Sequence, residues 1–308
     1  MFIVCWKYIV LFGLVVVNGE SLNDSENEAT DRISIAKCTE YQKICPLETS
    51  PFNIDAEVAA AKEFPHMALI GYQGENKTKW LCSGSLISEN FVLTAGHCAS
   101  SRHHVPTHVR LGDLDFDTEA DDVDVRQFNV TETFLYPDFA SSSNYDDIAL
   151  LKIDRTVDFS QYIQPACLPH LSTEISNKVV AAGWGRTLSA STMPMHKPPS
   201  ILQKVPLNLV PFDVCKESYP PSLRFREGLI NQTQLCAGSN PGERDTCAGF
   251  GGGPLMNTGR KFSCLYEIVG ITSLGRGCGE GDPGVYTRLT SYIDWIEGIV
   301  WPEEKKLV

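Results

Sequence analysis

Leu93-Thr94-Ala95-Gly96-His97-Cys98 carries the strongest signal in this chain, because two later stretches complete a pattern with it. Asp147-Ile148-Ala149-Leu150-Leu151 comes second, and Asp245-Thr246-Cys247-Ala248-Gly249-Phe250-Gly251-Gly252-Gly253-Pro254-Leu255 comes third. Nucleophilic hydrolysis needs a histidine that accepts the proton of the attacking hydroxyl, and a buried carboxylate that holds the imidazole in the right tautomer. His97 and Asp147 are residues of these two types. Without context, each of them would more often be structural.

The order and separations of the three stretches resemble those of trypsin-type proteases, and the chain from about Asn53 to Trp301 is similar to the chymotrypsin-like serine protease family. The resemblance implies an all-β fold of two six-stranded antiparallel Greek-key β-barrels with a C-terminal α-helix. It also places His97, Asp147 and Gly251 at the three positions of the catalytic triad. Four further stretches support it: Cys82-Ser83-Gly84-Ser85-Leu86-Ile87, Ala182-Gly183-Trp184-Gly185, Gly270-Ile271-Thr272-Ser273 and Pro283-Gly284-Val285-Tyr286-Thr287-Arg288.

The pattern of residue types along the chain also predicts an all-β fold, without reference to any family. After residue 52, short β-branched runs alternate with Gly, Pro, Asn and Asp, which predicts a sandwich or barrel of many short strands. Only Ser291 to Val300 places apolar residues at helical spacing. The runs that predict strands are Met67–Tyr72, Trp80–Ile87, Phe91–Ala95, His108–Leu111, Ile148–Ile153, Val179–Ala182 and Tyr266–Thr272.

The third member of the triad is missing. Where the family has Gly-Asp-Ser-Gly-Gly-Pro, this chain has Gly249-Phe250-Gly251-Gly252-Gly253-Pro254. Gly249 and Gly251 keep the oxyanion-hole positions, but Gly251 has no hydroxyl with which to form an acyl intermediate. Losing such a nucleophile costs on the order of 10⁶ in turnover. We therefore expect a pseudo-protease of the trypsin-like family in which no residue, including His97 and Asp147, is catalytic.

The activation machinery of the family is altered as well. Phe250 replaces the aspartate that receives the new α-ammonium after zymogen cleavage, and a phenyl ring cannot pair with an ammonium. Asn53-Ile54-Asp55-Ala56 stands where the mature N-terminus is expected, so the polar Asn53 would enter an apolar pocket. Residues 46–52 contain no Arg or Lys for a trypsin-like activator.

The specificity pocket is better preserved. Asp245 matches the position that gives trypsin-like enzymes their preference for Arg or Lys, and Ser273, Gly275 and Gly284 match other pocket positions. A buried carboxylate without a partner is costly. Two readings stay open: the pocket still takes a basic side chain, or Asp245 is paired or hydrated internally.

The organisation of the chain predicts a secreted, extracellular protein. Residues 1–19 contain Lys7, then an apolar run, and they end in small residues at the expected cleavage site, a pattern typical of a signal peptide. A polar leader with two cysteines follows over 20–52, then the protease-like domain over 53–301 and a polar tail over 302–308. Ten of the eleven cysteines remain after the signal, an even number that favours disulfides.

The disulfide pairing is only partly implied by the resemblance. The family implies Cys82–Cys98, Cys215–Cys236 and Cys247–Cys278. The remaining four cysteines allow three connectivities. We expect Cys45–Cys167 with Cys38–Cys264, because related proteases have a light-chain cysteine that reaches position 167. A local Cys38–Cys45 loop is the alternative.

Charge and motifs exclude several kinds of partner. Without Lys7 the chain has 25 basic and 38 acidic residues, net −13, which argues against nucleic acid and anionic membranes. No pair of cysteines has zinc-site spacing, and the acidic stretch 113–124 lacks the EF-hand pattern. We expect no metal and no cofactor, although calcium in that stretch stays open. Four sequons are glycosylation candidates: Asn23, Asn76, Asn129 and Asn231.

The resemblance narrows to arthropod haemolymph proteases of the snake type. It rests on Lys37-Cys38-Thr39-Glu40-Tyr41, on Glu63-Phe64-Pro65-His66-Met67, and on Cys264 with the strand after it. Apart from Cys5 in the signal peptide, only two cysteines precede Asn53, so we expect no complete six-cysteine clip domain. The resemblance implies a regulator or cofactor of an extracellular proteolytic cascade that binds proteases, zymogens or inhibitors. The alternatives are an active Arg/Lys-specific endopeptidase that uses Thr246 or Ser273, and a venom or salivary binding protein. The oligomeric state cannot be predicted.

Overall fold

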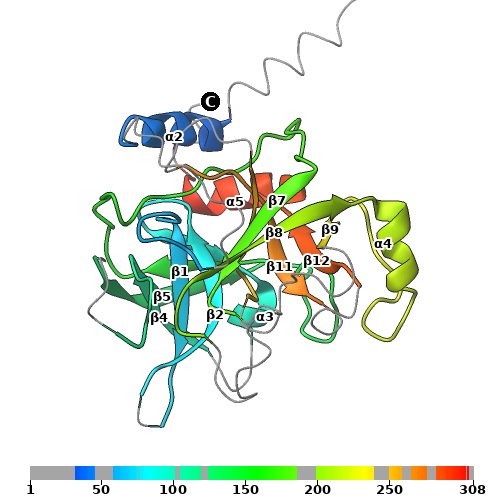
Figure 1. Cartoon of the computed structure of the whole chain (residues 1–308), viewed down its shortest axis with the longest axis horizontal. Coiled ribbons are helices and arrows are strands. Elements are labelled where there is room, and N and C mark those ends of the chain that lie inside the picture. The colour runs from blue at the N-terminus through cyan, green and yellow to red at the C-terminus, as the bar shows by residue number, and fades with distance from the viewer. Residues whose placement is uncertain are drawn as a thin grey trace, which may run out of the picture.

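Two closed β-barrels form the body of the protein (Figure 1). The structure is a computed structural model, and it describes residues 32–45, 58–75, 77–100, 105–118, 124–185, 199–238, 250–258, 265–275, 282–302 and 304. Strand order is β1-β2-β3-β6-β5-β4 in the first barrel and β10-β11-β12-β9-β8-β7 in the second, with every neighbouring pair antiparallel. A helix follows the last strand, so the predicted fold class is confirmed.

The strands are short, as the sequence predicts. The first barrel consists of β1 (Met67–Tyr72), β2 (Lys79–Leu86), β3 (Phe91–Thr94), β4 (Pro106–Leu111), β5 (Arg126–Leu135) and β6 (Ala149–Ile153). The second consists of β7 (Lys178–Gly183), β8 (Gln203–Val210), β9 (Gln234–Gly238), β10 (Pro254–Asn257), β11 (Ile268–Leu274) and β12 (Gly284–Arg288). The helices are α2 (Ile33–Gln42), α3 (Gly96–Ala99), α4 (Phe212–Ser218), the 3-10 turn η2 (Leu289–Ser291) and α5 (Ile293–Val300).

The apolar runs are continuous because both faces of several strands are buried. Successive side chains of a strand point to opposite faces. In β1, Ala68 and Ile70 fill the interior of the first barrel, whereas Leu69 joins a larger core cluster. In β7, Val179 fills the second barrel, whereas Val180 joins the same larger cluster. That shared cluster contains residues of both barrels and of α5, and it therefore packs the two barrels together.

The leader contains a helix that is packed onto the body, next to α5 (Figure 1). The guanidinium of Arg32 donates to Oδ1 of Asp294 at 2.6 and 2.9 Å and lies 3.6 Å from the carboxylate of Glu297. The hydroxyl of Ser34 donates to buried Glu297 at 2.7 Å, and Cys38 is bonded to Cys167. Helix α2 is thus held by charge, hydrogen bonds and a covalent link. Among the described residues, no helix combines the length and apolarity that crossing a membrane requires.

The Cys38–Cys167 bond corrects one sequence-based expectation. Cys45–Cys167 with Cys38–Cys264 is wrong, and so is the local Cys38–Cys45 loop. The physical reason is the register of α2, which places Cys38 half-buried against Cys167 while Cys45, itself disulfide-bonded, follows the helix. The expected Cys82–Cys98 and Cys215–Cys236 bonds are present. Cys247, Cys264 and Cys278 lie outside the described residues.

Cys38 and Cys167 are 129 positions apart in sequence, so a protease digest places them on different peptides. Peptide mapping under non-reducing conditions is therefore expected to recover these two peptides linked by the disulfide. The digest is made at acidic pH, where thiolates are scarce and disulfides do not exchange. The Cys215–Cys236 pair in the same digest is the internal control. A linked pair that contains Cys45 and Cys167 instead would contradict the prediction.

Candidate functional site

His97 and Asp147 form a hydrogen-bonded pair at the ends of two neighbouring strands. His97 lies in α3, directly after β3, and Asp147 lies shortly before β6, the strand that pairs with β3. Nδ1 of His97 is 2.8 Å from Oδ2 of Asp147, and the backbone N–H of His97 donates to Oδ1 at 2.7 Å. The carboxylate is buried and the imidazole is exposed. This is the arrangement that orients an imidazole to accept a proton at Nε2.

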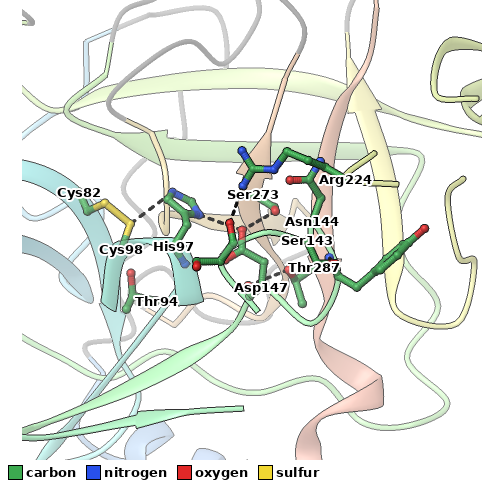
Figure 2. A network of polar contacts seen from close by, with 12 residues as sticks. Cys82, Thr94, His97, Cys98, Ser143, Asn144, Asp147, Arg224, Ser273 and Thr287 are labelled. Atoms are coloured by element: carbon green, nitrogen blue, oxygen red, sulfur yellow. Dashed lines mark hydrogen bonds and ion pairs between the residues drawn. A yellow bond between two sulfur atoms is a disulfide. The ribbon is translucent and has the colours of Figure 1, made fainter. Parts of the chain in front are cut away.

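The second barrel contributes the other contacts of Asp147 (Figure 2). Ser273 of β11 donates its hydroxyl to Oδ2, and Thr287 of β12 donates its hydroxyl to the backbone carbonyl of Asp147 at 2.8 Å. Burial disfavours the charged carboxylate, but the hydrogen bonds and the charge of His97, with the bond from Ser273, outweigh it and hold the pKa of Asp147 below its ordinary value. The pair therefore sits at the junction of the two barrels.

Gly251 lies directly against the imidazole. A Cβ atom on residue 251 would stand 2.8 Å from Nε2 of His97 and 3.9 Å from Sγ of Cys98, and the first of these distances is shorter than real Cβ contacts. The ring thus occupies the space that the first side-chain atom of a nucleophile would need. The site has a base and its orienting carboxylate, but nothing at position 251 for the base to deprotonate.

Backbone hydrogen bonds fix the segment around Gly251. The carbonyl of Gly251 accepts from the N–H of Ser83 at 2.9 Å, and Gly252 and Gly253 exchange bonds with Thr272, each at 2.9 Å. Gly252 has φ +77°, and a Cβ there would lie 2.2 Å from Oγ1 of Thr94, so only glycine fits. The segment is ordered by contacts with β2, β3 and β11.

Phe250 is completely buried in the second barrel. It belongs to the apolar cluster of that barrel, and its ring is so close to Gly183 that a Cβ on residue 183 would lie 2.9 Å from Cδ1 of Phe250. Its carbonyl accepts from the N–H of Gly253 at 2.8 Å. The side chain that replaces the family's aspartate is therefore part of the core.

The expected pocket residues are only partly described. Ser273 uses its hydroxyl on Asp147, so it belongs with the His97 pair. Gly284 is buried in β12, where a Cβ would lie 3.3 Å from the ring of Tyr286, and Gly275 is exposed just after β11. Asp245 and the oxyanion-hole position Gly249 lie outside the described residues, as does Asn53.

A buried ion pair anchors the segment that begins the described part of the protease-like domain. Lys204 of β8 places Nζ 2.5 Å from Oε1 of Glu63, and their side chains are 3% and 11% exposed. Oε2 of Glu63 accepts from the backbone N–H of Ala60 at 2.8 Å. The pair links the 58–66 segment to the second barrel.

Replacing Lys204 with methionine is expected to lower the free energy of unfolding by about 3 kcal/mol, because the carboxylate of Glu63 would stay buried without its partner. Lys152→Met is the matched control. Lys152 pairs with Glu132 at 2.8 Å, but these side chains are 42% and 52% exposed, so the loss should stay below about 1 kcal/mol. Urea unfolding measures both. Equal losses in the two variants would contradict the prediction.

The remaining candidates lie on the surface of the first barrel and near β9. Asn129 and Asn231 are exposed, as glycosylation requires, whereas Asn23 and Asn76 lie outside the described residues. In the acidic stretch, Asp113 pairs with Arg110 at 2.9 Å and Asp124 with Arg126 at 2.6 Å. Both carboxylates are thus engaged by arginines.

The sequence did not reveal that the loop before Asp147 contacts the loop around Arg224. Figure 2 shows Arg224 and Asn144, and the backbone carbonyl of Arg224 accepts from the N–H of Asn144 at 3.1 Å. The guanidinium of Arg224 donates to the carbonyl of Ser141 at 2.9 Å. Tyr145 donates its hydroxyl to the carbonyl of Gly228 at 2.8 Å. All three bonds end on backbone carbonyls, which leave no residue-type signal in a sequence.

Comparison with known proteins agrees with the two-barrel fold and the His97–Asp147 pair. A family described as Trypsin matches residues 54–296. The chain is 40% identical over 298 residues to Serine protease snk of Drosophila melanogaster, covering 88% of this chain and 66% of that protein. It is 32% identical over 269 residues to Phenoloxidase-activating factor 1 of Holotrichia diomphalia, covering 81% and 70%. It is 36% identical over 243 residues to Venom protease of Bombus pensylvanicus, covering 75% and 92%. The chain thus spans about two thirds of the length of the first of these relatives.

Proposed function

This chain belongs to the trypsin family, and we propose that within it the chain is a secreted, catalytically inactive homologue that acts by binding. One observation carries the proposal: the residue that faces Nε2 of His97 is Gly251. The His97–Asp147 pair can still move a proton, but position 251 has no atom that can attack a carbonyl carbon. Ser273 cannot substitute, because its hydroxyl donates to Asp147, away from Nε2.

The proposal extends to a role in an extracellular proteolytic cascade. Support comes from the name of one relative, Phenoloxidase-activating factor 1, together with a two-barrel scaffold that keeps its core and its His97 pair. Such a scaffold can present recognition loops to other secreted proteases, zymogens or inhibitors without cutting them. A signal peptide over 1–19 is part of the same proposal.

Hydrolysis and active-site labelling test the inactivity. The purified chain is incubated with an Arg-containing ester and, separately, with a fluorophosphonate probe, and trypsin is run in parallel as the positive control. We expect no turnover above the rate without protein and no labelled chain. Labelling that disappears in His97→Ala would overturn the proposal, because it would show that another hydroxyl serves this imidazole.

Capture from the body fluid of the source organism tests the binding role. The folded chain is immobilised beside a reduced and alkylated sample, which has the same sequence but no native surface. We expect secreted proteases, zymogens or their inhibitors on the folded sample alone. Recovery of none of these classes, or equal recovery on both samples, would count against a cascade role.

A further inference from the structure

The Cys82–Cys98 disulfide lies against the imidazole of His97. Sγ of Cys98 is 3.5 Å from Nε2, and the two sulfur atoms and a ring nitrogen of His97 lie within 4.8 Å of one another (Figure 2). The opposite ring nitrogen, Nδ1, is held by Asp147. The imidazole therefore presents one edge to a carboxylate and the other to a sulfur atom.

The two cysteines differ in what surrounds them. Cys98 is almost completely buried and contacts the imidazole, whereas Cys82 is half-buried at the middle of β2. A thiol from solvent that attacks the more accessible sulfur, Sγ of Cys82, makes Cys98 the leaving group. The rate of thiol–disulfide exchange rises as the leaving thiolate becomes more stable, and a neighbouring protonated histidine stabilises a thiolate.

We propose that Cys82–Cys98 is a labile disulfide that small dithiols open with the help of His97. Nε2 of His97 first takes the proton of one thiol of the dithiol, and the resulting thiolate attacks Sγ of Cys82 and forms a mixed disulfide. The sulfur–sulfur bond breaks, its electron pair goes to Sγ of Cys98, and this sulfur takes the proton from Nε2 of His97. The second thiol of the reagent then displaces Cys82, so that the dithiol is oxidised to a cyclic disulfide and the protein bond is reduced by two electrons.

Gly251 is part of this site. A Cβ on residue 251 would lie 3.9 Å from Sγ of Cys98 and 2.8 Å from Nε2, so any side chain there would crowd both the sulfur and the ring. Glycine therefore leaves room for the contact between this sulfur and the imidazole. The inference stands apart from the binding role proposed above, because thiol exchange needs neither a protein partner nor peptide hydrolysis.

The test compares two disulfides within one molecule. The folded chain is treated with dithiothreitol in the presence of EDTA, which keeps metal ions from the freed thiolates, and samples are quenched with N-ethylmaleimide over time. Mass spectrometry of peptides gives the rate at which each cysteine becomes alkylated. Cys215–Cys236, whose two residues are buried, is the internal control. We expect Cys82 and Cys98 to react about tenfold faster, the effect of one hydrogen bond to a charged group.

Variants assign the effect to the imidazole. His97→Ala, and His97→Gln as a variant that retains a side chain of similar length, are each expected to slow opening of Cys82–Cys98 about tenfold while leaving Cys215–Cys236 unchanged. His170→Ala removes a half-buried histidine elsewhere and should change neither rate. Equal rates for the two disulfides in the wild-type chain would overturn the proposal. So would an unchanged Cys82–Cys98 rate in both His97 variants.

Discussion

The double variant Phe250→Asp, Gly251→Ser is expected to hydrolyse an Arg ester no faster than the wild-type chain, about 10⁶-fold below an active serine protease. Both changes restore residues that the family has at these positions. They do not restore the surroundings that those residues need. The expected null result therefore separates the presence of a nucleophile from the presence of an active site.

The geometry gives two reasons for this result. The Cβ of a serine at position 251 would lie 2.8 Å from Nε2, so either the ring or the segment must move, and the ring is held by Asp147 through Nδ1. An aspartate carboxylate at position 250 would replace a ring that is buried in an apolar cluster, where an ionised group without a partner is strongly disfavoured. In the family that partner is a new α-ammonium, and residues 46–52 have no basic residue at which to create one.

The control for this experiment rebuilds the activation site as well. Phe52→Arg, Asn53→Ile and Ile54→Val are added to the double variant, and the protein is then cleaved by trypsin, which is removed before the assay. Hydrolysis that appears only in this cleaved variant would support the argument. Appreciable turnover from the double variant alone would show that activity does not depend on the activation switch.

The predicted strands include β1 and β6, whereas β5, β8, β9, β10 and β12 were missed, although every residue of β9 and β10 is buried. All residues of β1 are buried, as are four of the five residues of β6, so β1 has a continuous apolar sequence and only Lys152 interrupts that of β6. The run for β1 was predicted with its observed bounds. Strand β5 was missed, because only Phe128 of its ten residues is buried and most of the other nine are polar. It is a strand because β4 and β6 pair with it on both sides, which is a property of the closed barrel.

The helix in the leader, α2, is a second element that local sequence did not predict. Nothing in the apolar pattern of Ile33–Gln42 predicted a helix, and three of its residues are buried. Its stability comes from contacts with residues far along the chain: Arg32 and Ser34 reach Glu297, and Cys38 reaches Cys167. Such contacts leave no local trace, which is also why the cysteine pairing could not be chosen correctly.

The residues of the site could be predicted from the sequence, but their distances from one another could not. His97 and Asp147 were identified by motif, and the structure places them in hydrogen-bond contact. The loss of the hydroxyl at Gly251 was visible as well. What the sequence could not supply is the position of the imidazole, which stands close to both Gly251 and Cys98. Nor could the sequence show that the ring of Phe250 is buried inside the second barrel.

Replacing Phe250 with alanine is expected to lower the free energy of unfolding by about 4 kcal/mol, the usual cost of removing a buried phenyl ring. The ring is 0% exposed and fills the second barrel beside Gly183, so its removal leaves a cavity in the core. It also removes the anchor at the start of the 250–253 segment, whose other end is tied to β11 through Thr272. The measurement is urea unfolding followed by circular dichroism.

Two further variants make this result specific to burial of the ring. Leu223→Ala truncates a side chain that is 86% exposed and should change stability by less than about 0.5 kcal/mol. Phe250→Leu keeps an apolar side chain in the barrel and should cost clearly less than Phe250→Ala. If Phe250→Ala unfolds at the same urea concentration as the wild-type chain, the ring does not anchor the segment. In an active homologue an ion pair formed after cleavage would supply that anchor. Here packing that needs no cleavage replaces it, so this chain would hold its 250–253 segment in one arrangement from the moment it folds.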